Sequence, residues 1–154
     1  MRDEKSGRVG SAIQWIVIPD LTKSELTLSS VLLGGQVLED KNANAISPRV
    51  QLSVDHIFPR FSQLGYWVFV YNAKRDASGN PQVSIQTQVL RDGQPVLSSP
   101  QRKLNNTGPD FERIPFGDGI ALKTLTPGKY DLKVIVTDGI AGTSTSQIAD
   151  FIVQ

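Results

Sequence analysis

The twelve residues Leu125–Val136, LTPGKYDLKVIV, constrain the fold of this chain more than any other stretch. Pro127-Gly128 favours a tight turn, because proline fixes one backbone dihedral angle and glycine accepts a positive one. Beyond the turn, apolar side chains alternate with charged ones, which predicts a strand with one buried face. Tyr130 is the first residue of that face, and a tyrosine just after a turn at the start of a late strand is typical of the tyrosine corner of a β-sandwich.

Other strand patterns precede and follow this one, separated by proline and glycine turns. Tyr66–Tyr71, YWVFVY, is apolar on both faces and predicts a central strand. Residues 83–89 alternate between apolar and polar, and Asp92-Gly93 predicts a hairpin that turns residues 94–97 back. We expect further strands at Ser11–Ile18, at Leu26–Leu33 (with Leu26, Leu28 and Leu32 on one face and Gly34-Gly35 ending it), at Val50–Phe58 and at Thr143–Val153. Residues 111–123 predict one or two short strands, broken by Pro115 and by Asp118-Gly119.

Eight or nine short strands without a convincing amphipathic helix predict an all-β fold. The expected architecture is an antiparallel β-sandwich of the immunoglobulin or fibronectin III type, with Greek-key connections and little or no helix. A closed barrel fits less well, because the strand lengths and connections are uneven. With 154 residues, the chain is long enough for one domain with a full hydrophobic core.

Charge and cysteine content exclude several classes of partner and site. The chain has 16 basic and 15 acidic residues, and Arg102-Lys103 is its only adjacent basic pair, so we expect neither a nucleic-acid partner nor an anionic membrane partner. The apolar run Ile13–Ile18 is too short for a membrane span or a signal-peptide core. The chain has no cysteine, which removes disulfides and thiolate metal sites.

The first twenty residues repeat the spacing of a later stretch. The matching positions are Asp3, Gly7, Ser11 and Ile13 in the first stretch and Asp138, Gly142, Ser146 and Ile148 in the second. Residues 1–20 are therefore interpreted either as the closing strand of a preceding module or as an N-terminal strand added to the domain formed by residues 21–154. In the first case Ile13, Trp15 and Val17 are candidates for strand exchange with a neighbouring copy.

No arrangement of reactive side chains stands out. His56, the only histidine, alternates with Val54 and Phe58 and is predicted to be a partly buried structural residue. The nucleophile and phosphate-loop motifs are absent, and the turn aspartates Asp110, Asp118, Asp138 and Asp150 lack calcium-loop spacing. We therefore predict no catalytic residue, no metal and no cofactor.

Two sets of aromatic residues call for different predictions. Trp15, Trp67, Phe69 and Tyr71 lie within apolar strand patterns and are predicted to pack in the core. Phe111 and Phe116 lie in a loop-rich region beside Pro115, so they are the candidates for an exposed contact.

Six ordered motifs span nearly the whole chain: GRVGSAIQWIVIPDL (7–21), LTLSSVLL (26–33), VFVYNA (68–73), VSIQTQVLRDGQPV (83–96), LTPGKYDLKVIVTD (125–138) and ADFIVQ (149–154). Together they resemble the C-terminal region of the acidobacterial VWFA-related domain proteins. The resemblance implies an exported accessory module with an Ig-like fold, downstream of a von Willebrand factor A-like domain. The metal-dependent adhesion motif of such a domain, Asp-x-Ser-x-Ser, is absent here.

These observations favour a non-enzymatic β-sandwich module of an exported bacterial protein, secreted, periplasmic or at the cell surface. Its expected partners are proteins: other domains of the parent chain or a second copy. One alternative is a self-assembling subunit that adds strand 11–18 to a neighbour. Another is a carbohydrate- or calcium-binding module.

Overall fold

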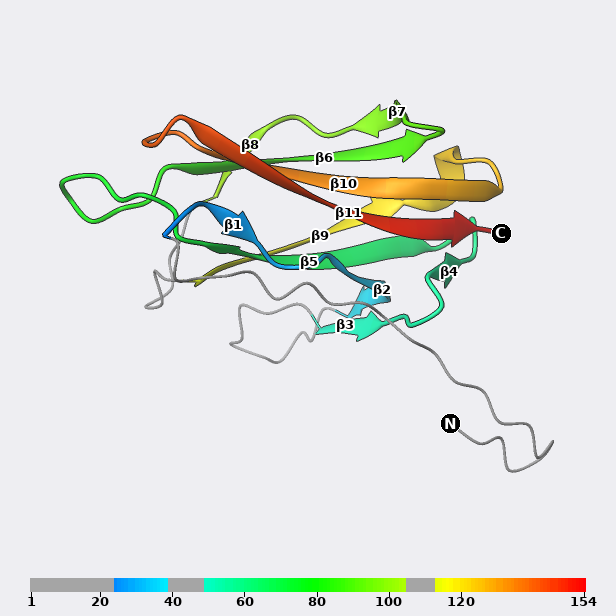
Figure 1. Ribbon diagram of the computed structural model, residues 1–154. Helices are drawn as coiled ribbons and strands as arrows, with labels where there is room; N and C mark the ends of the chain where they lie inside the picture. The colour runs from blue at the N-terminus through cyan, green and yellow to red at the C-terminus, as the bar shows by residue number, and fades with distance from the viewer. Residues whose placement is uncertain (1–23, 39–48, 105–112) are drawn as a thin grey trace.

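The computed structural model describes residues 24–38, 49–104 and 113–154 of the chain. Within these ranges the fold is an all-β sandwich of two facing sheets, as predicted (Figure 1). The predicted strand at 11–18, with Ile13, Trp15 and Val17, lies outside the described residues, and so does Phe111.

The first sheet is built around β5 (Gln63–Tyr71). On one side β5 pairs with β1 (Thr27–Leu28) and β2 (Leu32–Leu38), and β2 pairs in turn with β3 (Arg49–Leu52). On its other side β5 pairs with β9 (Arg113–Ala121) along its full length. All of these pairs are antiparallel, and the central position of β5 confirms the interpretation of YWVFVY.

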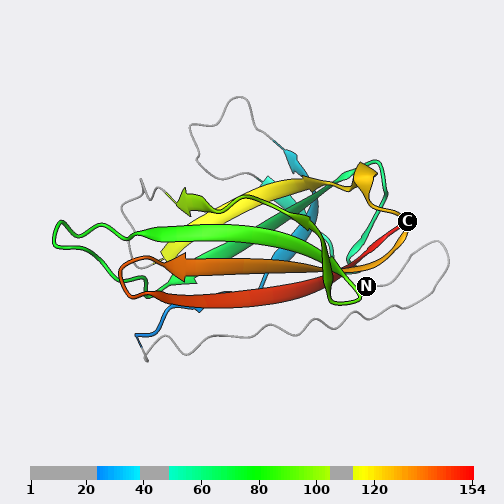
Figure 2. The ribbon, with the colours of Figure 1, turned by 90° about the horizontal axis from the view of Figure 1, so that it is seen from above.

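The second sheet is built around β10 (Gly128–Asp138), which lies between β6 (Val83–Arg91) and β11 (Thr143–Val153). Beyond β6 lie β7 (Gln94–Ser98) and β8 (Arg102–Leu104), and β4 (Ile57–Phe58) makes a short parallel pair with the end of β11. Figure 2 shows β6, β10 and β11 side by side from above. A single 3-10 turn, Leu122–Thr124, is the helical part of the described chain.

The chain passes between the sheets in the Greek-key manner of immunoglobulin domains. After β3 the chain contributes β4 to the second sheet and returns to the first for β5. It then forms β6–β8 in the second sheet, returns to the first at β9, and crosses again to form the hairpin of β10 and β11. The inward-facing side chains of both sheets make one core, which includes Leu28, Leu33, Leu64, Val68, Val70, Ile85, Val89, Leu132, Val134 and Phe151.

The predicted tyrosine corner is confirmed. The Tyr130 hydroxyl donates a hydrogen bond of 2.7 Å to the backbone carbonyl of Thr126, and Gly128 between them has a φ of 150°. The Tyr130 ring is buried and stacks on Phe151, with 5.6 Å between ring centroids. The predicted hairpin is also confirmed, because Asp92 and Gly93 both have positive φ and connect Arg91 to its strand partner Gln94.

The outer face of β5 differs from the prediction. Tyr66, Val68 and Val70 point into the core, whereas Trp67, Phe69 and Tyr71 point away from it and are only partly buried. Their rings are 6.1 Å and 6.5 Å apart in succession. The prediction that these three aromatic residues pack in the core is therefore wrong, since strand alternation places them on the opposite face.

Two strand boundaries also need correction. The stretch Leu26–Leu33 is divided into β1 and β2, and Leu28 and Leu33 are the fully buried leucines, not Leu28 and Leu32. Gly34 and Gly35 do not end the strand, because β2 continues through them to Leu38. The single strand predicted at Val50–Phe58 is likewise two short ones, β3 and β4, separated by residues 53–56.

Candidate functional site

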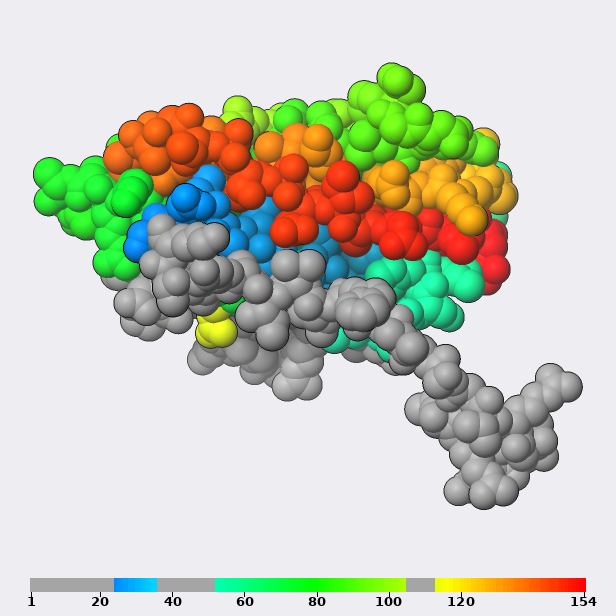
Figure 3. Space-filling view, viewed as in Figure 1, coloured from blue at the N-terminus to red at the C-terminus, as the bar shows by residue number. Residues whose placement is uncertain are grey.

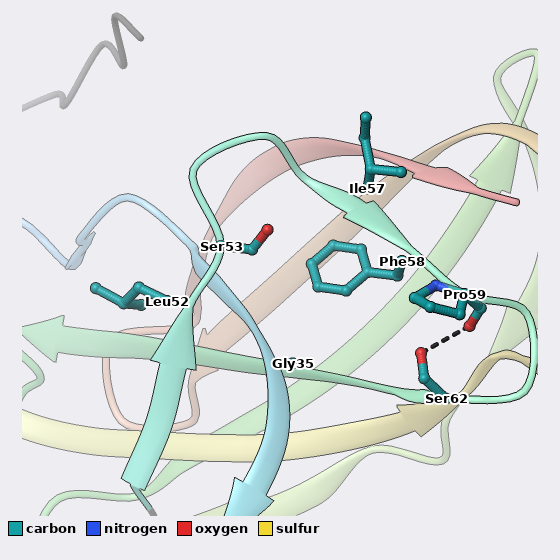
Figure 4. A pocket seen from close by; sticks show the side chains of 7 residues that line it. All are labelled: Gly35, Leu52, Ser53, Ile57, Phe58, Pro59 and Ser62. Carbon is teal, nitrogen blue, oxygen red and sulfur yellow. Dashed lines mark hydrogen bonds between the residues drawn. The ribbon is translucent and has the colours of Figure 1, made fainter. Parts of the chain in front are cut away.

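A shallow apolar hollow lies where β2, β3 and β4 meet at one end of the sandwich. Its volume is about 410 Å³, and Figure 4 shows the side chains around it. The lining residues are Gly35, Leu52, Ser53, Ile57, Phe58, Pro59 and Ser62. Phe58 forms the floor, because it is almost fully buried and meets Phe151 of the core in an edge-to-face contact.

Large apolar side chains are exposed on the segment that borders this hollow. Phe61 is 87% exposed, Val54 60%, Leu52 56% and Ile57 37%. The Arg60 guanidinium lies over the Phe61 ring, 5.6 Å from its centroid. We call these four apolar residues the end patch. Exposed apolar side chains rimmed by polar groups are typical of interaction sites.

The backbone of the end patch is held in place by polar contacts. The Asp55 carboxylate accepts hydrogen bonds from the Ser53 hydroxyl at 2.7 Å and from the Ile57 N–H at 3.3 Å. These contacts, the Ser53 hydroxyl first, lower the pKa of Asp55 below its ordinary value of 3.8. The Ser62 hydroxyl donates to the Pro59 carbonyl, and the Arg60 N–H donates to the carbonyl of Gln154. The loop therefore presents its apolar side chains from a fixed backbone.

His56 belongs to this scaffold. It has a positive φ of 54°, and its Nδ1 lies 2.9 Å from the carbonyl oxygen of Asp150 on β11. Because a carbonyl oxygen only accepts, Nδ1 carries the hydrogen of this bond. His56 is partly buried, as predicted, but it lies between β3 and β4 and not in a strand that alternates Val54, His56 and Phe58.

The expectation of a loop-rich region around Phe116 is wrong, because β9 continues without a break through Pro115 and Gly119. Phe116, a predicted exposed contact, is partly buried against the core. Its ring lies 6.1 Å from the Tyr66 ring, and the Arg102 guanidinium lies 5.6 Å from its centroid. Arg102 also forms an ion pair with Asp118 beside it. These contacts leave Phe116 little surface to offer, whereas Phe61, two residues after Pro59, is far more exposed. Phe61 was not among the residues predicted from the sequence. The one sequence feature that could have indicated its exposure is its place between the polar residues Arg60 and Ser62, in a segment without strand alternation.

The turn aspartates do not converge. Asp138 is buried with backbone N–H groups around its carboxylate, Asp118 pairs with Arg102, and Asp150 is exposed on β11. Asp110 lies outside the described residues. Among residues 24–38, 49–104 and 113–154, no group of three or more His, Cys, Asp or Glu side chains is close enough to hold a metal ion.

Comparison with known proteins gives no family assignment: no family model and no curated protein matches this chain. In the described part of the chain, no helix is long and apolar enough to cross a membrane.

Proposed function

We propose that this chain is a non-enzymatic accessory β-sandwich module of an exported bacterial protein, and that it binds another protein domain through the end patch. The exposure of Phe61 carries the proposal. Leaving a phenylalanine ring in water forgoes about 1.5–3 kcal/mol of burial free energy, which a bound partner would recover. The export and the bacterial source rest on the resemblance to the VWFA-related proteins.

The chemistry of the end patch supports protein binding. Aromatic residues and arginine are enriched among the residues that dominate interface energies, and Phe61 with Arg60 supplies one of each. The hollow beside them has room for one apolar side chain of a partner. Because the backbone between Ser53 and Ser62 is already held by hydrogen bonds, less conformational entropy would be lost on binding.

Two polar groups near the end patch take part in structural hydrogen bonds, which supports a non-catalytic role. His56 Nδ1 is bonded to a backbone carbonyl, and the Asp55 carboxylate caps its own loop. A reproducible hydrolysis of ester, glycoside, peptide or phosphoester substrates, lost when one carboxylate is replaced, would overturn the non-enzymatic proposal.

The binding surface is tested with Phe61→Ser, and with Val96→Ser as the matched control because Val96 is 50% exposed on β7. The measurement is an NMR titration of the ¹⁵N-labelled chain with the other domains of the parent protein. Wild type and Val96→Ser should show shifts centred on residues 52–61, and Phe61→Ser should lose them while keeping the same melting temperature. Shifts elsewhere on the surface, or none with any of those domains, would overturn the assignment of this patch.

A further inference from the structure

Within the described chain, the outer edge of β11 is unpaired over most of its length. On its inner side β11 pairs with β10 at each position from Thr143 to Val153, without a shift of register. On its outer side, the described chain supplies only β4, which pairs at Ile152 and Val153. Figure 3 shows residues of this strand as an orange-to-red band across the visible face. None of the described strands thus pairs with the outer side of the backbone from residue 143 to residue 150.

The contacts at the end of β11 identify the groups that point toward this open edge. The Ile152 N–H donates to the His56 carbonyl, and the Asp150 carbonyl accepts the bond from His56 Nδ1. Backbone groups of a strand alternate between its two edges. The N–H and C=O groups of Ser144, Ser146 and Ile148 therefore also point outward, whereas those of the residues between them point toward β10.

This edge lacks the features that protect the edges of β7, β8 and β9 from pairing with another strand. β7 carries Pro95 next to a register shift, β8 carries Arg102 and Lys103, and β9 carries Arg113 and Pro115. Residues 143–149 of β11 contain no charge, no proline and no bulge, and Ile148 is 58% exposed. A long, regular and uncharged edge pairs readily with another strand, so natural sheets normally cover or charge it.

We propose that residues 11–18 of the same chain, SAIQWIVI, add to this edge as a strand antiparallel to β11. The segment has eight residues, as many as the open stretch from Thr143 to Asp150, and it carries no charge. Its alternating Ile13, Trp15 and Val17 are suited to one face of a strand. This surface is separate from the end patch, so each of the two proposals can be tested without the other.

Chain connectivity supports this occupant and its direction. β1 lies next to β11, and in Figure 1 their arrows point the same way. Pro19-Asp20 is a turn signal between residue 18 and β1, and a reversal there makes the preceding segment run opposite to β11. Residues 19–26 can span up to about 26 Å, which is ample for such a return. The short link also gives the chain's own segment a much higher effective concentration than a second copy has.

Residue-resolved hydrogen exchange of the full chain tests the proposal, with an internal reference. The outward amides of Ser144, Ser146 and Ile148 should exchange as slowly as those of Thr145, Gln147 and Ala149, which face β10. Ile13→Pro should raise the outward rates at least tenfold and leave the reference rates unchanged, and Lys5→Pro is the control outside the segment. Fast outward exchange in wild type, or no effect of Ile13→Pro, would overturn the proposal.

Cross-linking decides whose segment is bound. The chain has no cysteine, so Ile148→Cys can be combined in turn with Ala12→Cys, Ile13→Cys, Gln14→Cys and Trp15→Cys. A disulfide requires Cα atoms about 4.4–6.8 Å apart, so at least one pair should oxidise within a single chain, and Lys5→Cys with Ile148→Cys should not. Disulfide-linked dimers, together with outward amide protection that rises with protein concentration, would overturn the proposal in favour of exchange between copies.

Discussion

Asp138 is the most deeply buried of the acidic residues described. Its side chain is fully buried, and its carboxylate accepts N–H bonds from Ile140 and Ala141 in the β10–β11 turn and from Lys74 in the β5–β6 connection. Burial alone would raise the pKa of Asp138. The three N–H donors and the nearby Lys74 charge outweigh burial and lower this pKa below its ordinary value of 3.8. One carboxylate thereby fastens two connections at the same end of the sandwich.

Asp138→Asn is expected to destabilise the fold by about 2 kcal/mol at neutral pH, the usual size for charged hydrogen bonds. Because the folded-state pKa is lowered, the ionised carboxylate stabilises the fold fully above its unfolded pKa of about 3.9. This contribution is lost as the pH falls through the folded pKa. Urea unfolding of both proteins at a series of pH values should show the difference shrinking below about pH 4.

Asp92→Asn is the control for this prediction, because it removes one carboxylate from an exposed hairpin turn where asparagine tolerates the positive φ. It should leave stability nearly unchanged at all pH values. A difference between wild type and Asp138→Asn that stays constant down to pH 3 would show that the charge of Asp138 does not stabilise the fold.

At the scale of single elements, a side chain explains why one predicted strand became two. The Ser29 hydroxyl accepts the Phe69 N–H at 2.9 Å, in the position where a backbone carbonyl would continue the ladder to β5. The inward positions change from Leu28 before this break to Val31 and Leu33 after it. Alternation predicted that this stretch forms β structure, but a local reading cannot show that a serine replaces a ladder bond. Local alternation likewise could not show that β3 and β4 are separate strands, because β3 pairs with β2 in the first sheet and β4 pairs with β11 in the second.

The pairing of β5 with β9 depends on a glycine under an aromatic ring. Gly117 lies opposite Trp67 in the register, and a Cβ added at Gly117 would overlap the Trp67 ring at Cε3. Gly117→Ala should therefore displace the ring and destabilise the fold by about 1–3 kcal/mol, the usual cost of overpacking. The measurements are the melting temperature and the NMR shift of the Trp67 indole N–H.

Gly35→Ala is the matched control for Gly117→Ala. Gly35 lies in β2 of the same sheet, and an added Cβ there meets no atom within 4 Å. Its effect should be much smaller than that of Gly117→Ala. Equal effects of the two substitutions would mean that the cost arises from the loss of glycine in a strand and not from contact with Trp67.

At the scale of the whole molecule, the fold could be predicted from the sequence but the end patch could not. The tyrosine corner and the Asp92-Gly93 hairpin are encoded by neighbouring residues, so periodicity and turn chemistry identified them. The exposure of Phe61 depends on how β4 and the end of β11 meet residues distant in the chain. The outer position of Trp67 depends in the same way on which face of β5 the second sheet covers.

The two sheets are joined in the core by a polar contact between Tyr66 of β5 and Thr87 of β6. Their side-chain oxygens are 2.7 Å apart, and both residues are buried. Burial raises the pKa of Tyr66 to about 12, so its phenol stays protonated and keeps a hydrogen for this bond. A buried hydroxyl that loses its partner costs about 1–3 kcal/mol, whereas replacing both partners by apolar groups costs less than the sum of the single changes.

A double-mutant cycle measures this contact between the sheets. Tyr66→Phe and Thr87→Val should each lower the free energy of unfolding in urea by about 1–2 kcal/mol, and the double variant should lose about 1 kcal/mol less than their sum. Tyr71→Phe, on the partly exposed outer face of the same strand, should change it by less than about 0.5 kcal/mol. Strict additivity of the two core substitutions would mean that apolar packing alone, and not this bond, holds the sheets together at Tyr66.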